Sequence, residues 1–422
     1  MTIYAFNFFI MMFAEIVNQM KIIQSTLLEF LEDNSDTEDK YQNFIDLATN
    51  PQIIEDQYEF KLLLHLISRI ESNHQRVHNF ISKIEQILKH FKDYLKNYFS
   101  NSEIFAIFRS NKRILLFLIQ EEIITIDEQI VLRIIREKHA EYFAPEIRPF
   151  ITEEFIKKHR KYNKYIDNDY FIEEITKEVP KEFYYKRKEG ENDDFLCTLI
   201  RFDYIEEFVA FVNQANISLH SVIKKSIFET NPFLLKDDDI LLIEYAAFFG
   251  SNRIIKYMQI NGVKLTPSCW YYAIHSNNAE LIKELEEKHV SPTFNKYEAV
   301  LWESIKCHHN DVSNYIIDNL INKENLHYNN ESSFDNYVCH YAIEYHNYYF
   351  LPEKMTDKMI FFFLCKFHYY KLVKFYLHNE IIEINTKYIG ATVFLMEFQN
   401  DKNIYDIQNY LILNDIKIIN FF

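Results

Sequence analysis

Histidine and cysteine, the residue types that bind zinc or supply a thiol nucleophile, lie close together at three places in the chain. These places are Cys307-His308-His309, Cys339-His340, and the pair Cys365 and His368. Cys365 and His368 are one helical turn apart, so both could contact one ion. A structural zinc site needs four ligands, usually as two short-spaced pairs, and the sequence shows no such arrangement. We therefore predict no metal, and a metal-binding or enzymatic protein that uses a Cys/His cluster is kept as an alternative.

Adjacent carboxylates could do acid–base chemistry, but only where a pocket moves their pKa values apart. The runs are Glu173-Glu174, Glu206-Glu207, Asp237-Asp238-Asp239 and Glu286-Glu287. The aspartates precede the apolar run of an expected helix, where acidic groups complement the helix dipole. We interpret all four runs as helix caps and solvated faces, and we predict no catalytic residue.

Glycine content and net charge exclude several binding functions. The 422 residues include only four glycines, so no glycine-rich loop can cradle the phosphates of a nucleotide cofactor. Lys and Arg number 46 against 62 Asp and Glu, giving a net charge of −16, which argues against nucleic-acid binding. Basic clusters at 157–161 and 186–188 are interpreted as solvated helical faces, with a nuclear signal or nucleic-acid patch as the alternative. We expect no cofactor, nucleic acid, membrane or small-molecule substrate.

The elements that would position these residues are helices. Apolar residues recur at steps of three or four, as in Met20, Ile23, Leu27 and Leu31, which predicts a helix over 15–32. No long alternating segment predicts a sheet, so the fold class is all-α. Residues 1–14 form an apolar leader too short to span a bilayer, which we interpret as part of a buried first helix or as poorly ordered, with a signal or anchor segment as the alternative.

One window carries the clearest sign of a repeat. Residues 242–265 contain the pair Ala246-Ala247, then Gly250, then the apolar pair Ile254-Ile255, and finally Gly262. Small alanines allow two helices to approach closely, and each glycine can adopt the positive φ that ends a helix. The two glycines are 12 residues apart. This spacing predicts two short antiparallel helices separated by a sharp turn.

The same 12-residue frame finds degenerate copies elsewhere. Residues predicted to occupy the glycine positions are Ser110, Glu122, Asn216, Asn277, His289, His308, Leu320, His368 and Glu380. Asparagine is a physically reasonable replacement, because its side chain tolerates the left-handed backbone region. Repeats of this kind stack on their neighbours and build an extended surface, which suits binding rather than catalysis.

The window 242–265 resembles an ankyrin repeat, although the usual Thr-Pro-Leu-His opening is replaced by Leu242-Ile243-Glu244-Tyr245. Longer runs are similar to a large family of uncharacterised ankyrin-like proteins from trichomonad protists, a domain of unknown function. The runs are LLLHLIS (62–68), YFSNSEIF…SNKRILLFLI (98–119), SIFETNPFLL (226–235), LIEYAAFFGS (242–251), WYYAIHSNNAELI (270–282) and ESIKCHHNDV (303–312). The resemblance implies an ankyrin-like fold and no particular activity.

We therefore predict four parts: a leader (1–14), an N-terminal helical domain that can itself be divergent repeats (15–144), a charged helical connector (145–192) and an ankyrin-like repeat solenoid (193–422). The expected function is a non-catalytic scaffold for an unidentified protein partner, with a self-assembling structural protein as a further alternative. Candidate partner-binding residues at the repeat turns are Lys264, Ser268, Tyr271, Thr293, Asn295 and Tyr297. Five scattered cysteines fit a reducing compartment, so we expect a cytoplasmic protein.

Overall fold

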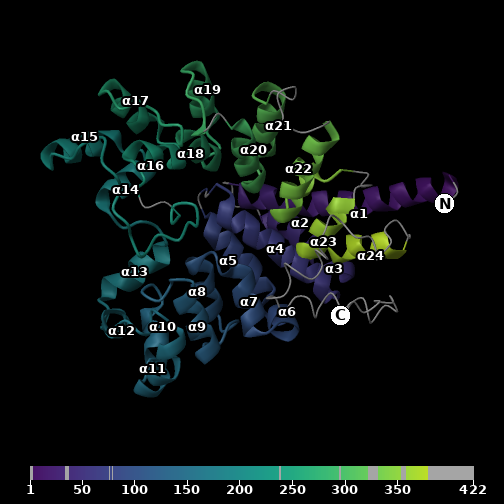
Figure 1. The fold of residues 1–422 in the computed structure, drawn as a ribbon, viewed down its shortest axis with the longest axis horizontal. Helices are drawn as coiled ribbons and strands as arrows, with labels where there is room; N and C mark the ends of the chain where they lie inside the picture. Colours follow the sequence, from purple (N-terminus) through teal and green to yellow (C-terminus); the bar gives the residue numbers. More distant parts are fainter. Residues whose placement is uncertain are drawn as a thin grey trace. The chain divides into compact units, whose positions relative to one another are not determined.

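A computed structural model of the chain describes residues 3–33, 38–75, 77, 79–236, 239–293, 296–321, 331–352 and 358–378 (Figure 1). Over these residues the regular elements are all helices, and the single strand-like pairing is an antiparallel bridge between Val222 and Leu241. The predicted all-α class is confirmed. Within the described ranges, no helix combines the length and apolarity needed to cross a membrane. The predicted positions Asn295, Glu380, Asp237 and Asp238 lie outside the described residues.

The chain divides into two compact units, which we call the terminal unit and the central unit. The terminal unit comprises Met1–Phe30, Glu38–Leu66 and Lys323–Phe422, and the central unit comprises Leu31–Thr37 and Ile67–Asn322. This division differs from the predicted domains, because residues 38–66 group with 323–422 rather than with the residues up to 144. The boundary falls within two continuous helices, α1 (Ile3–Leu31) and α4 (Gln57–Asn73).

The terminal unit joins helices from both ends of the sequence. Besides most of α1 and the first part of α4, it contains α2 (Glu38–Ala48), α3 (Pro51–Ile54), α22 (Glu331–Glu344), η5 (Tyr348–Phe350), α23 (Lys358–Lys366) and α24 (Tyr370–His378). Aromatic pairs join the two ends: the Phe13 and Phe375 ring centroids are 5.9 Å apart, and those of Tyr58 and Tyr370 are 4.4 Å apart. Residues 3–14 of the predicted leader belong to α1, and the apolar spacing continues through the buried Phe13 into the rest of the helix.

The central unit contains the remaining helices in chain order. Its first half holds α5 (Phe80–His90), α6 (Lys92–Tyr98), α7 (Asn101–Phe108), α8 (Lys112–Gln120), α9 (Glu128–Arg136), α10 (Ala144–Ile147), η1 (Arg148–Phe150), α11 (Glu153–His159), η2 (Arg160–Tyr162), α12 (Asp169–Thr176) and α13 (Lys181–Glu189). Its second half holds α14 (Phe195–Arg201), α15 (Ile205–Gln214), α16 (Leu242–Phe249), α17 (Asn252–Ile260), α18 (Cys269–His275), α19 (Ala279–Glu287), α20 (Tyr297–Lys306) and α21 (Asn310–Asn319). The helices from α10 to α13 cover most of the range 145–192.

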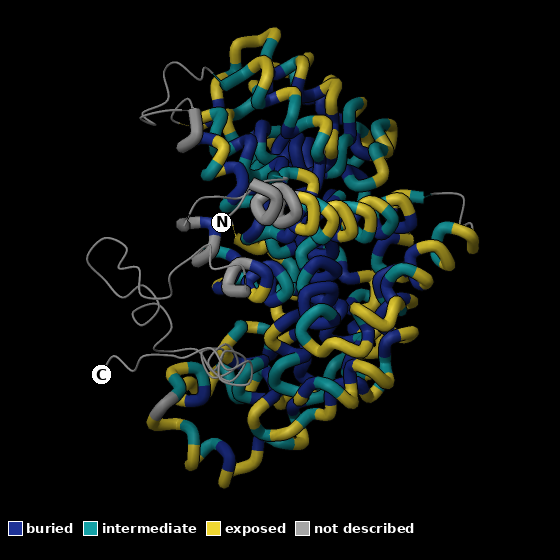
Figure 2. Tube along the Cα trace, turned by 90° about the vertical axis from the view of Figure 1, so that its right-hand side faces the viewer, coloured by how far each residue is buried: buried dark blue, intermediate teal, exposed yellow. Residues whose placement is uncertain are grey.

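In the second half of the central unit, consecutive helices contact each other in pairs, α14 with α15 through α20 with α21. The first helix of each pair also contacts the first helix of the next, in the order α14, α16, α18, α20 (Figure 1). These first helices are the most buried ones of this half, and α16 is buried over Leu242–Phe248. Figure 2 draws the buried residues in dark blue along the trace. Ala246 and Ala247 are fully buried on it, as expected for small residues at a close helix contact.

The turn between the two helices of a pair recurs with the same backbone geometry. Gly250 has φ +67°, and the amide of Ser251 donates to the carbonyl of Ala246 across the end of α16, as in a Schellman motif. Asn277 and His308 also have positive φ values, 49° and 60°, and the same hydrogen bond follows each of them. The left-handed backbone predicted at Gly262, Glu122, Asn216, His289 and His368 is likewise present.

Two predicted turn positions are wrong. Leu320 has φ −111° and Ser110 is not left-handed, because a branched or hydroxyl side chain gives no preference for that region. The structure adds left-handed residues that the frame did not predict, among them Asp203 and His346. Asp203 has a second role, since its carboxylate accepts hydrogen bonds from the backbone amides of Arg253 and Ile254 at the start of α17.

The second basic cluster is a solvated face only in part, because Lys188 is exposed and Lys186 is half-buried but the arginine between them is not solvated. Arg187 on α13 is 2% exposed, and its guanidinium Nη1 lies 2.6 Å from Glu146 Oε2. It also lies over the ring of Phe183, 5.3 Å from the centroid, and donates to the backbone carbonyl of Tyr142. A guanidinium is the cation best suited to such a half-apolar, bidentate environment. This arginine therefore stabilises the fold of the central unit.

Candidate functional site

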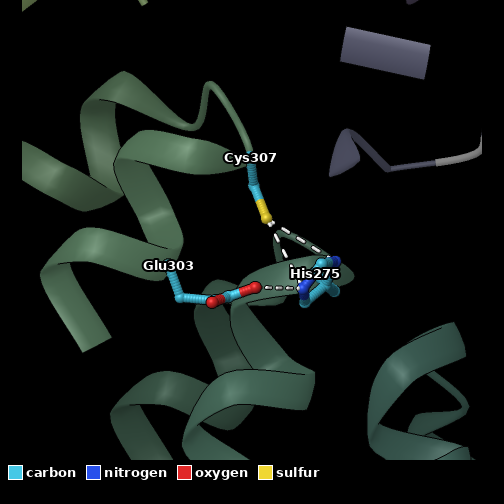
Figure 3. Close-up of side chains that lie close together, drawn as sticks. All are labelled: His275, Glu303 and Cys307. Carbon is cyan, nitrogen blue, oxygen red and sulfur yellow. Dashed lines mark hydrogen bonds and ion pairs between the residues drawn. The ribbon is translucent and has the colours of Figure 1, made fainter. Parts of the chain in front are cut away.

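A histidine, a carboxylate and a thiol meet in the central unit (Figure 3). His275 is the last residue of α18, and Glu303 lies on α20, whose C-cap is Cys307. Glu303 and Cys307 are four residues apart and share one face of α20. Because α18 and α20 are in contact, His275 is brought against that face. We call His275, Glu303 and Cys307 the buried triad.

The triad is connected by short polar contacts. His275 Nε2 is 2.7 Å from Glu303 Oε1, while Cys307 Sγ is 3.5 Å from Nδ1 and 3.7 Å from Nε2 of His275. The side chain of His275 is 1% exposed, that of Glu303 is 18% exposed, and Cys307 is fully buried. A fourth side chain, positively charged, joins them, because Lys306 Nζ is 2.5 Å from the same carboxylate oxygen.

The charge states follow from burial and from this neighbouring lysine. Burial alone would raise the pKa of Glu303, but the hydrogen bond from His275 and the positive charge of Lys306 hold it well below its usual range. Burial lowers the pKa of His275 and raises that of the Cys307 thiol well above its usual value. At neutral pH the triad is therefore a carboxylate, a neutral imidazole that donates from Nε2, and a protonated thiol.

The order thiol, imidazole, carboxylate is that of a cysteine nucleophile with its base and orienting acid. Two observations argue against this chemistry. Cys307 is fully buried, so a substrate has no access to its sulfur. The raised pKa of the thiol also keeps it in its unreactive protonated form.

Two more histidines surround the triad. His74 Nδ1 lies 2.7 Å from the carbonyl oxygen of Cys307, and its Nε2 lies 2.9 Å from Glu32 Oε1. His309 is buried, its ring donates to the backbone carbonyl of His275, and burial lowers its pKa well below the usual value. Within the described part of the chain, His309 Nε2 has no hydrogen-bond partner. This nitrogen is an uncompensated polar atom in the interior.

Sequence reasoning found part of this cluster. It singled out Cys307, His308 and His309 but missed His275 and Glu303. The sequence did contain signals for both residues. Glu303 and Cys307 are four residues apart, as on one face of a helix. The repeat frame places His275 at the end of the first helix of the preceding pair. Cys339-His340 and the pair Cys365 and His368 belong to no group of three potential metal ligands among the described residues. Burial raises the pKa of Cys365 to about 12, and His368 Nδ1 lies 3.0 Å from the Tyr370 hydroxyl.

The predicted partner-binding residues lie on or near the connecting loops. Lys264 and Thr293 are exposed, and Ser268 and Tyr271 are half-buried. Tyr297 is also half-buried and packs edge-on against Trp270, with ring centroids 5.4 Å apart. Lys264 lines an apolar hollow of about 290 Å³ with Leu219, His220, Leu241, Ile243, Gly262, Val263 and Thr266. The hollow brings together the loops that precede α16 and α18.

No family model, no curated protein and no solved structure matches the chain. The resemblance to ankyrin-like proteins therefore stays a prediction, and function is inferred from the residues and their contacts.

Proposed function

We propose that the chain is a non-catalytic scaffold that binds a protein partner through an ankyrin-like stack of helix pairs in its central unit. One observation carries this proposal. The left-handed turn recurs at Gly250, Asn277 and His308, and each time it follows a first helix that contacts the first helix of the neighbouring pair. Units that contact mainly their neighbours form extended surfaces, which bind macromolecules better than they enclose small substrates.

The hollow beside Lys264 is the part of this surface with a suitable composition. Its lining is apolar apart from Lys264, His220 and Thr266, and none of its lining residues is acidic, although the chain as a whole is strongly acidic. An apolar recess beside an exposed cation fits an apolar side chain of a partner together with a neighbouring carboxylate. The enzyme alternative lacks comparable support, because the thiol–imidazole–carboxylate arrangement seen among the described residues is buried.

Quantitative affinity enrichment with the full chain tests the proposal. The informative variant is Lys264→Glu, and the matched control is Lys283→Glu, which makes the same charge change at a mostly exposed position on α19. We expect at least one protein that the wild type and the control enrich equally and that Lys264→Glu enriches much less. If the three baits enrich the same proteins to the same extent, the hollow is not a binding surface. If the wild type enriches none, the scaffold function is wrong.

A further inference from the structure

We infer that the buried triad, together with His309, is a site for one Zn²⁺ ion that fastens two neighbouring helix pairs to each other. The four side chains come from α18 and from the end of α20 with the turn that follows it. The site is separate from the proposed binding surface and does not depend on that function.

The distances within the triad suit this ion. Tetrahedral zinc, with Zn–N near 2.0 Å and Zn–S near 2.3 Å, places a nitrogen and a sulfur ligand about 3.5 Å apart. Cys307 Sγ is 3.5 Å and 3.7 Å from the two ring nitrogens of His275. One ligand atom from each of the three residues lies within 4.8 Å of the other two. A nitrogen and an oxygen ligand stand about 3.3 Å apart around tetrahedral zinc. His275 Nε2 and Glu303 Oε1 are 2.7 Å apart, so these two atoms must move apart when the ion binds.

His309 supplies the fourth ligand. A ligating histidine normally binds the ion through one ring nitrogen while the other donates to a carbonyl or carboxylate. His309 has this arrangement, because its ring donates to the carbonyl of His275 and leaves Nε2 without a partner. This nitrogen lies outside the 4.8 Å group, so its side chain must move toward the triad when the ion binds.

The charges balance at the ion. When Zn²⁺ binds, the Nε2 proton of His275 moves to Nδ1, so that the imidazole stays neutral and Nε2 can bind the ion. The Cys307 thiol releases its proton to solvent and a Zn–S bond forms, without oxidation or reduction. One thiolate and the Glu303 carboxylate neutralise the two positive charges, and the two imidazoles are neutral ligands. A carboxylate has two oxygens, so Glu303 can contact the ion through one and Lys306 through the other.

His74 holds the metal-binding end of α20 in place. Its Nδ1 donates to the carbonyl of Cys307, and its Nε2 contacts the carboxylate of Glu32. The bound ion would then connect α18 directly to α20, which no covalent bond does among the described residues, where all five cysteines are free.

Cobalt substitution in the full chain tests the site. The chain is treated with a chelator and titrated with Co²⁺ and then with Zn²⁺ as competitor, while absorbance and proton release are recorded. We expect one ion per chain, a thiolate-to-cobalt charge-transfer band, the strong visible bands of tetrahedral Co²⁺, and release of one proton. Weak octahedral bands only, binding without a thiolate band, or no stoichiometric binding would each overturn the inference.

Variants assign the ligands. Cys307→Ser is expected to remove the charge-transfer band and to weaken binding by more than about 100-fold. The control Cys269→Ser changes another buried thiol, on α18 but outside the triad. This variant is expected to keep both the charge-transfer band and the affinity for the ion unchanged. His309→Gln is expected to weaken binding while keeping the thiolate band. A band that survives in Cys307→Ser refutes the site, and the wild-type titration decides the question if that variant does not fold.

Discussion

The two units use the same local turn but assemble it differently. In the central unit, Gly250, Asn277 and His308 hold the left-handed positions, and helices that are neighbours in the sequence are also neighbours in space. In the terminal unit, His346 and His368 hold the left-handed positions after α22 and α23. Their imidazole rings stack on that of His65 in α4, with centroids 5.6 Å and 5.2 Å apart.

This difference shows that the turn does not determine how helices assemble. A left-handed residue ends a helix by satisfying its last carbonyls, which is a local event. What the chain then packs against depends on the side chain at that position and on the apolar faces available. In the terminal unit, the turns at His346 and His368 both pack against His65, which lies 281 and 303 residues earlier in the chain and is brought there only by the tertiary structure.

The terminal unit also depends on a polar contact between its two sequence ends. The side-chain amide of Gln24, 2% exposed, donates to Asn347 Oδ1 at 2.9 Å and accepts from the backbone amide of Tyr348. Asn347 is fully buried, directly after the left-handed His346. One side chain of α1 thus satisfies the polar groups of a turn near the other end of the sequence.

The largest expected effect lies in the central unit. Glu303→Ala removes the carboxylate that contacts both of the buried side chains His275 and Lys306. We expect a loss of about 3–5 kcal/mol in the free energy of unfolding. Trp270 and Trp302 are the two tryptophans of the chain and both lie in this unit, so urea unfolding followed by tryptophan fluorescence measures it. Glu287→Ala, at a 65% exposed side chain on α19, is the control and should change little.

The contact of Gln24 with the turn at Asn347 is expected to give the second-largest loss of stability. Gln24→Ala leaves the buried backbone amide of Tyr348 without an acceptor, at a cost of about 2 kcal/mol. Hydrogen exchange should become faster in α1 and in residues 345–350, while tryptophan fluorescence still reports a normal transition for the central unit. Unchanged exchange in both segments would contradict the dependence of one end on the other.

The turn itself is expected to rank third. Gly250→Val places a β-branched residue at φ +67° and should cost about 1–2 kcal/mol. Crowding adds little, because a Cβ there would lie 3.7 Å from Asn278 Nδ2, an ordinary contact. Gly250→Asn should cost clearly less, since Asn277 holds the same position in the next pair. Equal tryptophan-fluorescence midpoints for both variants would contradict a left-handed requirement.

The smallest expected effects are on the pH dependence of stability, which has opposite signs at two buried groups, one in each unit. Burial raises the pKa of Glu59 in the terminal unit to about 7, although Lys371 lowers it and Asp56 raises it further. Its contribution to stability is complete below pH 4.5 and is lost as pH rises through 7. Burial lowers the pKa of His139 in the central unit to about 4, although it hydrogen-bonds to the carbonyl of Arg109. That contribution is complete above pH 6.5 and is lost as pH falls through 4.

Both side chains are partly exposed, so we expect about 1 kcal/mol for each across these windows. Glu59→Gln should flatten the loss of stability that circular dichroism detects between pH 5 and 7. His139→Gln should reduce the acid destabilisation that tryptophan fluorescence reports. The same sign of pH dependence at the two positions would mean that their burial does not govern their ionisation.

The sequence by itself determined the helical class and most of the turns. Apolar spacing fixes which face of a helix is buried, and a glycine or asparagine fixes where the backbone can turn left-handed, so both can be predicted from a few neighbouring residues. Leucine and serine have only a weak preference for the left-handed backbone region, which explains why the turns predicted at Leu320 and Ser110 were wrong.

Only the tertiary structure decided which distant residues meet. Nothing near Gln24 indicates Asn347, and nothing in the run Cys307-His308-His309 indicates His275 and Glu303 as its partners. Such contacts depend on how whole helix faces pack, and the free energy of packing is summed over many residues that no local pattern contains. The boundaries of the two units were missed for the same reason, because residues 38–66 find their apolar partners at the other end of the chain.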